Sequence, residues 1–199
     1  MAAEIAEELN LPLDVFLVRK IGVPGYEELA MGAIASGGVR ILNDEVLASI
    51  SHAGEMLDRV TAMESQELAR REAEYRAGLP PLDLEGRCVL LVDDGLATGA
   101  SMRAAVGAVR KLGAKWVVVA VPVGPPSTCA LLEAEADSVV CPLQPERFQS
   151  VGEFFEDFSQ ITDAEVCALL RRGAGEVRPS EGATKHTKGH EKTDEHDEE

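Results

Sequence analysis

The sequence has few aromatic residues and no long apolar run. Only 4% of its 199 residues are aromatic. No stretch reaches the roughly 18 consecutive apolar residues that cross a bilayer as a helix, and the first residues do not have the pattern of a secretory signal peptide. We therefore expect a cytoplasmic protein that makes no contact with a membrane.

Cysteines are also few, and none of the four belongs to a Cys-x-x-Cys pair. Cys88, Cys129, Cys141 and Cys167 are scattered, and three of them lie in apolar surroundings. Zinc sites and disulfide frameworks usually show close or regular cysteine spacing. The pattern favours buried free thiols over its alternatives, a zinc site or disulfides, and we assign no protein ligand to a metal.

Positive charge is scarce, with 19 Lys and Arg residues against 35 Asp and Glu residues and a formal net charge of −16. Proteins whose main task is nucleic-acid binding usually carry a basic stripe. We therefore expect no nucleic-acid partner. A phosphorylated substrate would need locally arranged positive charge, and Mg²⁺ is the cation that commonly supplies it.

The most informative stretch runs from Cys88 to Ser101 and reads CVLLVDDGLATGAS. Its apolar start predicts a strand buried on both faces, as in a parallel sheet. Asp93 and Asp94 come directly after this strand, at the edge of an α/β sheet where ligands bind. The segment from Met102 to Leu112 then predicts a helix.

The loop between this strand and this helix has the composition of an anion site. Gly95 and Gly99 permit positive φ and close approach of a ligand, while Thr98 and Ser101 carry hydroxyls that can bind an anion or cap the helix. A helix N-terminus adds convergent N–H groups and about half a positive charge. The loop has neither the Walker A lysine nor the G-x-G-x-x-G pattern. An ordinary turn is the alternative interpretation.

An apolar strand, two aspartates and T-G-A-S resemble the signature of type I phosphoribosyltransferases, which bind 5-phosphoribosyl 1-pyrophosphate (PRPP). The resemblance implies that Asp93 and Asp94 are the catalytic acids beside the ribose 2′- and 3′-hydroxyls. It also implies a loop that holds the 5′-phosphate, formed by Gly95, Ala97, Thr98, Gly99, Ala100 and Ser101. The implied reaction transfers the phosphoribosyl group to a small nitrogenous base and releases pyrophosphate, with Mg²⁺ as cofactor. A non-catalytic PRPP- or nucleotide-binding regulatory protein is the alternative function, and a scaffold protein is a third.

The segment upstream offers cations and a candidate closing loop. Val15 to Val18 predicts a strand, and Arg19 and Lys20 follow it, where they would neutralise pyrophosphate or phosphate charge. A solvated strand end is the alternative. Ile21 to Glu28, with two glycines and a proline, is expected to be a loop that closes over the substrate. VRK, this loop and the hairpin predicted over Leu29 to Asn43 resemble a bacterial phosphoribosyltransferase-like subgroup.

The remaining pattern alternates strands and helices, which is typical of a parallel sheet with crossover helices. We predict strands over Lys115 to Val123 and Val139 to Cys141, and helices over Met1 to Leu9, Asp44 to Gly78, Thr128 to Ala136 with Ser127 as N-cap, and Ala164 to Arg172. The predicted fold class is α/β: a parallel-sheet, Rossmann-like core of the type I phosphoribosyltransferase kind, with an antiparallel hairpin and a small C-terminal hood.

Four of the five phenylalanines gather in the predicted hood. Phe148, Phe154 and Phe155, with Phe158 beside them, are candidates for the pocket that stacks on the base. The alternative is that these rings seal the edge of the domain or form the interface of a homodimer.

Residues 1–173 are predicted to form one phosphoribosyltransferase-like domain, and residues 174–199 a disordered acidic tail with almost no large apolar side chains. Metal binding by the tail histidines His186, His190 and His196 is a weak alternative. The resemblance also implies a first core strand and a Gly-rich loop that binds pyrophosphate. Both would precede the helix with which this sequence opens, so we expect an N-terminally incomplete domain.

Overall fold

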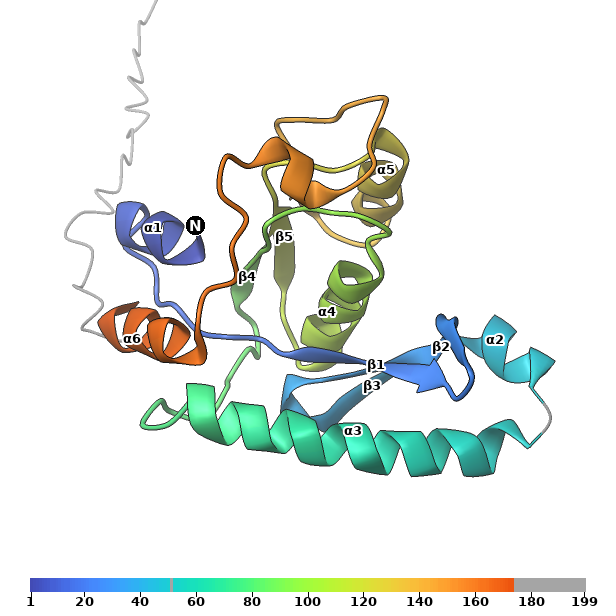
Figure 1. Cartoon of the computed structure of the whole chain (residues 1–199). Helices are drawn as coiled ribbons and strands as arrows, with labels where there is room; N and C mark the ends of the chain where they lie inside the picture. The colour runs from blue at the N-terminus through green and yellow to red at the C-terminus, as the bar shows by residue number, and fades with distance from the viewer. Residues whose placement is uncertain (51, 174–199) are drawn as a thin grey trace, which may run out of the picture.

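The computed structural model describes residues 1–50 and 52–173. Two three-stranded sheets, one parallel and one antiparallel, lie on either side of helix α4 (Figure 1). The predicted disordered tail, 174–199, lies outside the described residues, as do the tail histidines. The mixed α/β architecture confirms the predicted fold class.

The parallel sheet contains the motif strand. Its order is β4 (Cys88–Val92), β5 (Trp116–Ala120) and β6 (Ser138–Val140), and all pairs are parallel. Helices α4 (Ala100–Lys111) and α5 (Pro126–Glu133) connect successive strands. This arrangement confirms the predicted alternation, and it brings the carboxyl ends of all three strands to one edge.

Helix α4 is buried on two sides because it lies between the sheets (Figure 1). Its small residues permit close packing: a Cβ added to Gly107 would lie 3.1 Å from Cδ1 of Ile41 in the antiparallel sheet. Its other side packs on the parallel sheet, in a core that includes Leu91, Met102, Val106, Val109, Val117 and Val119. The position of the helix is therefore set by both sheets at once.

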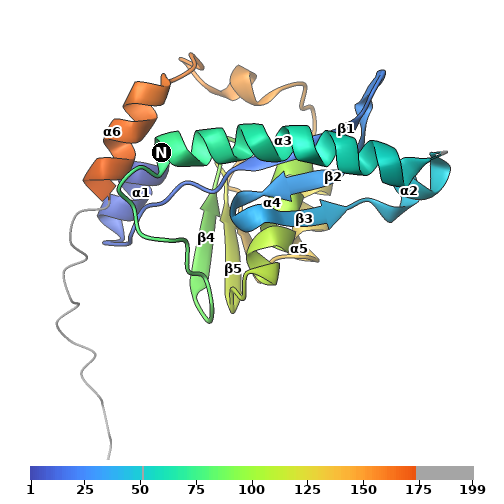
Figure 2. The same ribbon diagram turned by 90° about the horizontal axis from the view of Figure 1, so that it is seen from below.

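The antiparallel sheet consists of β1 (Val18–Val23), β2 (Tyr26–Ala35) and β3 (Val39–Leu42). The long helix α3 (Ala53–Tyr75) covers the face opposite α4, and α2 (Asp44–Ser49) lies at its end (Figure 2). Ile21, Met31, Ile34 and Leu68 form the second core between this sheet and α3. The hairpin predicted over 29–43 and the helical segment predicted over 44–78 are confirmed.

Two predictions about the first strand are wrong. The strand begins at Val18 rather than Val15, so Arg19 and Lys20 lie inside it and not at its end. The predicted closing loop over Ile21 to Glu28 is a β-hairpin whose turn is confined to Pro24 and Gly25. The physical reason is burial: Ile21 and Val23 point into the core beneath α3, which holds this stretch in the sheet.

The two terminal helices, α1 (Ala2–Glu8) and α6 (Asp163–Gly173), pack against each other beside α3, which α6 also contacts. A short 3-10 turn, η2 (Val151–Phe154), precedes α6. The terminal helices confirm the predicted ones, and each end differs from the prediction by one residue. Among the described residues, no helix has both the length and the apolar character needed to span a bilayer.

All four cysteines are free, as predicted, but only Cys129 and Cys141 are buried. Burial and the neighbouring Cys129 thiol raise the pKa of Cys141 to about 12, which keeps this thiol protonated. Cys88 is exposed at the first residue of β4, and its partner Trp116, at the first residue of β5, is exposed as well. Only Leu91 of β4 is buried, and Val89, Leu90 and Val92 are half-buried, so the prediction of a strand buried on both faces is wrong.

Two arginines of α4 bind the helix to the segment that follows α5. Arg103 pairs with Glu135, and Arg110 lies 2.6 Å from Asp137. Asp137 also accepts the N–H of Val117 over an N···O distance of 2.6 Å. The Val117 N–H and then the Arg110 guanidinium lower the pKa of Asp137, because both stabilise its carboxylate.

The lowered pKa makes the contribution of Asp137 dependent on pH. Because the folded-state pKa lies below the ordinary value, the carboxylate stabilises the fold above that ordinary value, and the effect is lost as pH falls through the lowered pKa. We predict that Asp137→Asn lowers the melting temperature at neutral pH, with a deficit that shrinks towards acid. Asp83→Asn, at an exposed pair with Arg87, is the control and should change little. A deficit of equal size at every pH would contradict this account.

Candidate functional site

Asp93 and Asp94 lie directly beyond β4, at the carboxyl edge of the parallel sheet. The N–H of Asp93 donates to the carbonyl of Ala120, at 3.4 Å, which continues the pairing with β5. The N–H of Asp94 donates to the Asp93 carboxylate at 3.0 Å. Both residues are exposed, so two adjacent acids are presented to solvent at the edge where α/β sheets bind ligands.

The Asp93 carboxyl has an environment unlike that of its neighbour. Asp93 is exposed as a residue, but nearby protein atoms partly remove its carboxyl from water, and this raises its pKa. The charge of Asp94 raises the pKa further, while the Asp94 N–H opposes the shift. A positive charge near this carboxyl would reverse the effect, because it stabilises the ionised form.

The loop after the acids rests on the segment that follows β5. Leu96 is 2% exposed, and its N–H donates to the carbonyl of Val123 at 2.9 Å. Its side chain lies on Gly124, where an added Cβ would come within 2.9 Å of the Leu96 Cβ. The apolar residue in the middle of the loop is thus an anchor, and it leaves the polar residues around it at the surface.

The loop ends where α4 begins, and the start of this helix has no side-chain cap. Gly99 is the N-cap residue with φ +73°, and no side chain accepts a hydrogen bond from the first turn in the capping position. Thr98 Oγ1 accepts the N–H of Ala100 only at 3.4 Å, while Thr98, Ala100 and Ser101 are exposed. N–H groups at the start of a helix that lack a side-chain cap are a common place for anions to bind in proteins.

One residue that contacts the loop had no role in our sequence interpretation. The Thr128 hydroxyl donates to the carbonyl of Ala97 at 3.0 Å, although 31 positions separate the two residues. Thr128 also lies against Gly99, where an added Cβ would come within 2.6 Å of the Thr128 Cγ2. No local pattern signals such a contact. The prediction that Ser127 is the N-cap of this helix is wrong, because α5 begins at Pro126 and its N-cap residue is Pro125.

The predicted hood lies over the same edge of the sheet (Figure 1). Val151 packs on Gly95 so closely that an added Cβ there would come within 2.7 Å of the Val151 Cγ1. Phe148 and Phe154 stack with ring centroids 5.7 Å apart, and Phe155 contacts Phe158 at 5.2 Å. The structure therefore joins the phenylalanine segment to the motif loop through Val151 and Gly95.

The predicted phosphate-binding cations lie elsewhere. Figure 1 shows β1 beside the C-terminal end of α4, whereas the segment that joins β4 to α4, residues 93–99, lies at the N-terminal end of this helix. A helix of 12 residues is about 18 Å long. Arg19 is moreover bound to Glu64 of α3, at 2.5 Å between Nε and Oε2. The structure therefore does not bring Arg19 and Lys20 together with Asp93 and Asp94.

The donor set at the acidic pair suits one kind of metal ion. Among the described residues, no three His, Cys, Asp or Glu side chains are grouped as metal ligands. Mg²⁺, however, is often held by one or two carboxylates while water and substrate phosphates complete its coordination. Asp93 and Asp94 fit an ion that arrives with a phosphorylated substrate, and they do not form a complete cage.

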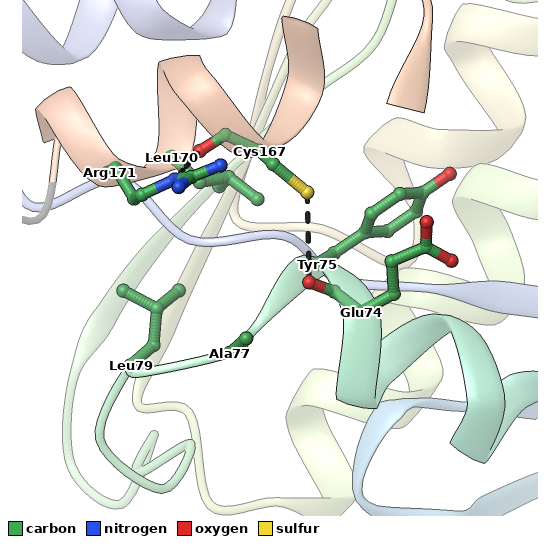
Figure 3. A pocket seen from close by; sticks show the side chains of 7 residues that line it. All are labelled: Glu74, Tyr75, Ala77, Leu79, Cys167, Leu170 and Arg171. Carbon is green, nitrogen blue, oxygen red and sulfur yellow. Dashed lines mark hydrogen bonds between the residues drawn. The ribbon is translucent and has the colours of Figure 1, made fainter. Parts of the chain in front are cut away.

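A hollow of about 120 Å³ lies between α3 and α6 (Figure 3), and Figure 1 shows these helices away from the carboxyl edge of the parallel sheet. Cys167 lines it and donates its thiol to the Glu74 carbonyl at 3.6 Å, and Arg171 donates to the Cys167 carbonyl at 3.1 Å. Because these polar groups bind one another, we interpret the hollow as a packing gap between helices.

Gly99, which is buried between exposed residues at the start of α4, gives a direct test of the loop geometry. We predict that Gly99→Ala destabilises the protein, because left-handed backbone costs roughly 1 kcal/mol for alanine and the contact with Thr128 adds about 1 to 3 kcal/mol. Gly38→Ala is the matched control, since Gly38 has φ +71° but nothing within 4 Å of an added Cβ. Urea unfolding measures both free energies, and equal losses would contradict the packing of Thr128 against Gly99.

Comparisons with known proteins agree with this geometry. Residues 1–157 match the phosphoribosyl transferase domain family. The chain is 44% identical over 172 residues to two Mycobacterium tuberculosis proteins, "Putative phosphoribosyl transferase Rv0571c" from strain H37Rv and "Putative phosphoribosyl transferase MT0597" from strain CDC 1551. These matches cover 86% of this chain and 39% of each relative, so the chain spans well under half of their length.

A solved structure shows the same fold. The crystal structure of TT1426 from Thermus thermophilus superposes with a TM-score of 0.76 at 42% sequence identity, covering 87% of this chain and 82% of that one. The family match extends over most of the described chain and includes the strand, the acidic pair and the whole loop. Because both its sequence and its fold match, the chain belongs to the phosphoribosyl transferase domain family.

Proposed function

We propose that this protein transfers the phosphoribosyl group of PRPP to a small nitrogenous base and releases pyrophosphate. The observation that carries the proposal is the edge described above: two exposed acids, a small-residue loop and an uncapped helix start, all within Asp93 to Ser101. The family membership of the chain supports it.

The 5′-phosphate of PRPP binds at the start of α4 in this proposal. Thr98, Ala100 and Ser101 are exposed there, and the N-cap residue Gly99 has no side chain that could accept from the first-turn N–H groups. A phosphate monoester carries nearly two negative charges, which the N–H groups and the helix dipole stabilise without any lysine. The sequence has no Walker lysine in this loop, and this arrangement does not need one.

The acids belong beside the ribose. A nitrogen of the base forms a bond to C1 of the ribose while the bond from C1 to the pyrophosphate oxygen breaks, and pyrophosphate leaves with the electron pair. Positive charge grows on the ribose ring during this step. Asp93 and Asp94 stabilise that charge and hold the ribose hydroxyls, so the contribution of the protein is positioning and electrostatics.

Magnesium fits this proposal as an ion bound with PRPP. Mg²⁺ neutralises part of the charge on the leaving pyrophosphate when it is bound. The chain contributes the carboxylates of Asp93 and Asp94, and a nearby cation favours the ionised form of Asp93, whose pKa is otherwise raised. Without such a cation, a protein with a net charge of −16 repels a substrate that carries several negative charges.

In this proposal the acceptor base binds beside the C-terminal hood that carries the phenylalanines. Phe148, Phe154 and Phe155 are partly buried on the segment that Val151 fastens to Gly95, which places planar rings at the same edge as the acids. A planar heterocycle stacks on such rings. The aromatic residues therefore support a nitrogenous base as the acceptor.

The double substitution Asp93→Asn with Asp94→Asn tests the proposal. We predict that pyrophosphate release from Mg·PRPP, measured with a panel of bases, falls by about a hundredfold or more, because charge stabilisation of the transition state is lost. Folding should survive, since both residues lie at the surface and the partly buried Asp93 carboxyl, whose pKa is raised, is replaced by a neutral group.

The matched control is Asp44→Asn with Glu45→Gln, an adjacent exposed pair in the first turn of α2 that removes the same charge away from the site. Its turnover should stay at the wild-type value. Unchanged turnover in the Asp93 and Asp94 variant would overturn the proposal. Tight binding of Mg·PRPP by the wild type with no pyrophosphate release for any base would instead favour a PRPP-binding regulatory protein.

A further inference from the structure

We propose that Thr128 is a positioning residue that holds the phosphate loop in its ligand-binding shape from beneath, although it belongs to another crossover connection. The inference rests on the proposed function, because it assigns Thr128 a role in binding the 5′-phosphate. Its basis is a pair of contacts that one side chain makes with the two ends of a three-residue segment, Ala97 to Gly99.

The two contacts use the two branches of the Thr128 side chain. Oγ1 donates to the Ala97 carbonyl at 3.0 Å, and Cγ2 lies against Gly99. A β-branched side chain has few rotamers, so both branches are placed once the backbone of Thr128 is placed. The residue is 6% exposed, and little water competes for the Ala97 carbonyl.

The backbone of Thr128 is itself well fixed. Its N–H donates to the Pro125 carbonyl at 3.0 Å in the first turn of α5. Pro125 and Pro126 restrict the chain that enters this turn. The connection from β5 to α5 therefore acts as a rigid support, and the Leu96 N–H bond to the Val123 carbonyl attaches the same loop to the same connection.

The contact between Thr128 and the Ala97 carbonyl also fixes the direction of the Thr98 N–H, because both groups belong to one peptide. The C=O of Ala97 and the N–H of Thr98 belong to one planar trans peptide, in which they point in opposite directions. Since the carbonyl of Ala97 points to Thr128, the N–H of Thr98 must point away from α5. Gly99 then turns the chain with φ +73° into α4. Thr128 thus determines which way the first donor of the phosphate loop faces.

The role predicts a specific kinetic signature. Loss of the hydroxyl should free the Ala97–Thr98 peptide to rotate, which weakens binding of the 5′-phosphate but leaves the acids and the hood in place. We expect Thr128→Val to weaken binding of ribose 5-phosphate and Mg·PRPP by roughly tenfold, the value of one well-placed hydrogen bond. The KM for PRPP should rise with little change in the KM for the base.

The experiment compares variants that differ in one group. Thr128→Val replaces only the hydroxyl with a methyl group, and Thr128→Ser restores the hydroxyl without the methyl group. Thr61→Val is the matched control, because Thr61 is a buried threonine of α3 whose hydroxyl has no partner among the described residues. Calorimetric titration with ribose 5-phosphate and steady-state kinetics with Mg·PRPP are measured for each, with melting temperatures as a check of folding.

We expect the wild type, Thr128→Ser and Thr61→Val to bind ribose 5-phosphate similarly and Thr128→Val to bind it weakly. If Thr128→Val does not fold, Thr128→Ala against Thr128→Ser makes the same comparison of the hydroxyl. Equal affinity with and without the hydroxyl, in folded variants of a wild type that binds, overturns the inference and leaves the proposed function intact. No binding of ribose 5-phosphate or Mg·PRPP by the folded wild type overturns both.

Discussion

The burial of helix α4 between two sheets is the constraint on which the candidate site depends. The parallel sheet places the strand that leads into the loop, and the antiparallel sheet holds the far half of the helix through contacts such as Gly107 with Ile41. The helix cannot shift without disturbing its packing against both sheets. An anion site made of backbone N–H groups needs this rigidity, because its donors have no side-chain freedom with which to adapt.

Local patterns in the sequence predict the parallel half of the fold. Neighbouring residues alone suffice to predict the strand that begins at Cys88, the acids after it and the helix that ends near Gly113. The structure has all three close to the predicted positions. The first strand was misjudged because glycine and proline near Pro24 favour a loop locally, while burial of Ile21 and Val23 under α3 favours a hairpin. Tertiary packing decides that competition, and the sequence does not display it.

The same distinction applies within the site. The positions of Asp93, Asp94 and the loop beyond β4 follow from strand and helix signals, but the partners of these residues do not. Thr128 reaches Ala97 across 31 positions, and Arg19 is bound to Glu64 across 45, and neither pairing leaves a local trace. What the structure adds is a loop that contacts Thr128 of α5 on one side and Val151 of the phenylalanine segment on another.

The central claim is that backbone N–H groups at the start of α4 hold a phosphate monoester. Amide chemical shifts of the ¹⁵N-labelled chain, recorded during titration with ribose 5-phosphate, test it most directly. We expect saturable shifts of the Thr98, Ala100 and Ser101 amides, together with unchanged amide shifts in the hairpin from Val18 to Ala35. Saturable binding that shifts amides elsewhere and leaves this loop unchanged would contradict it.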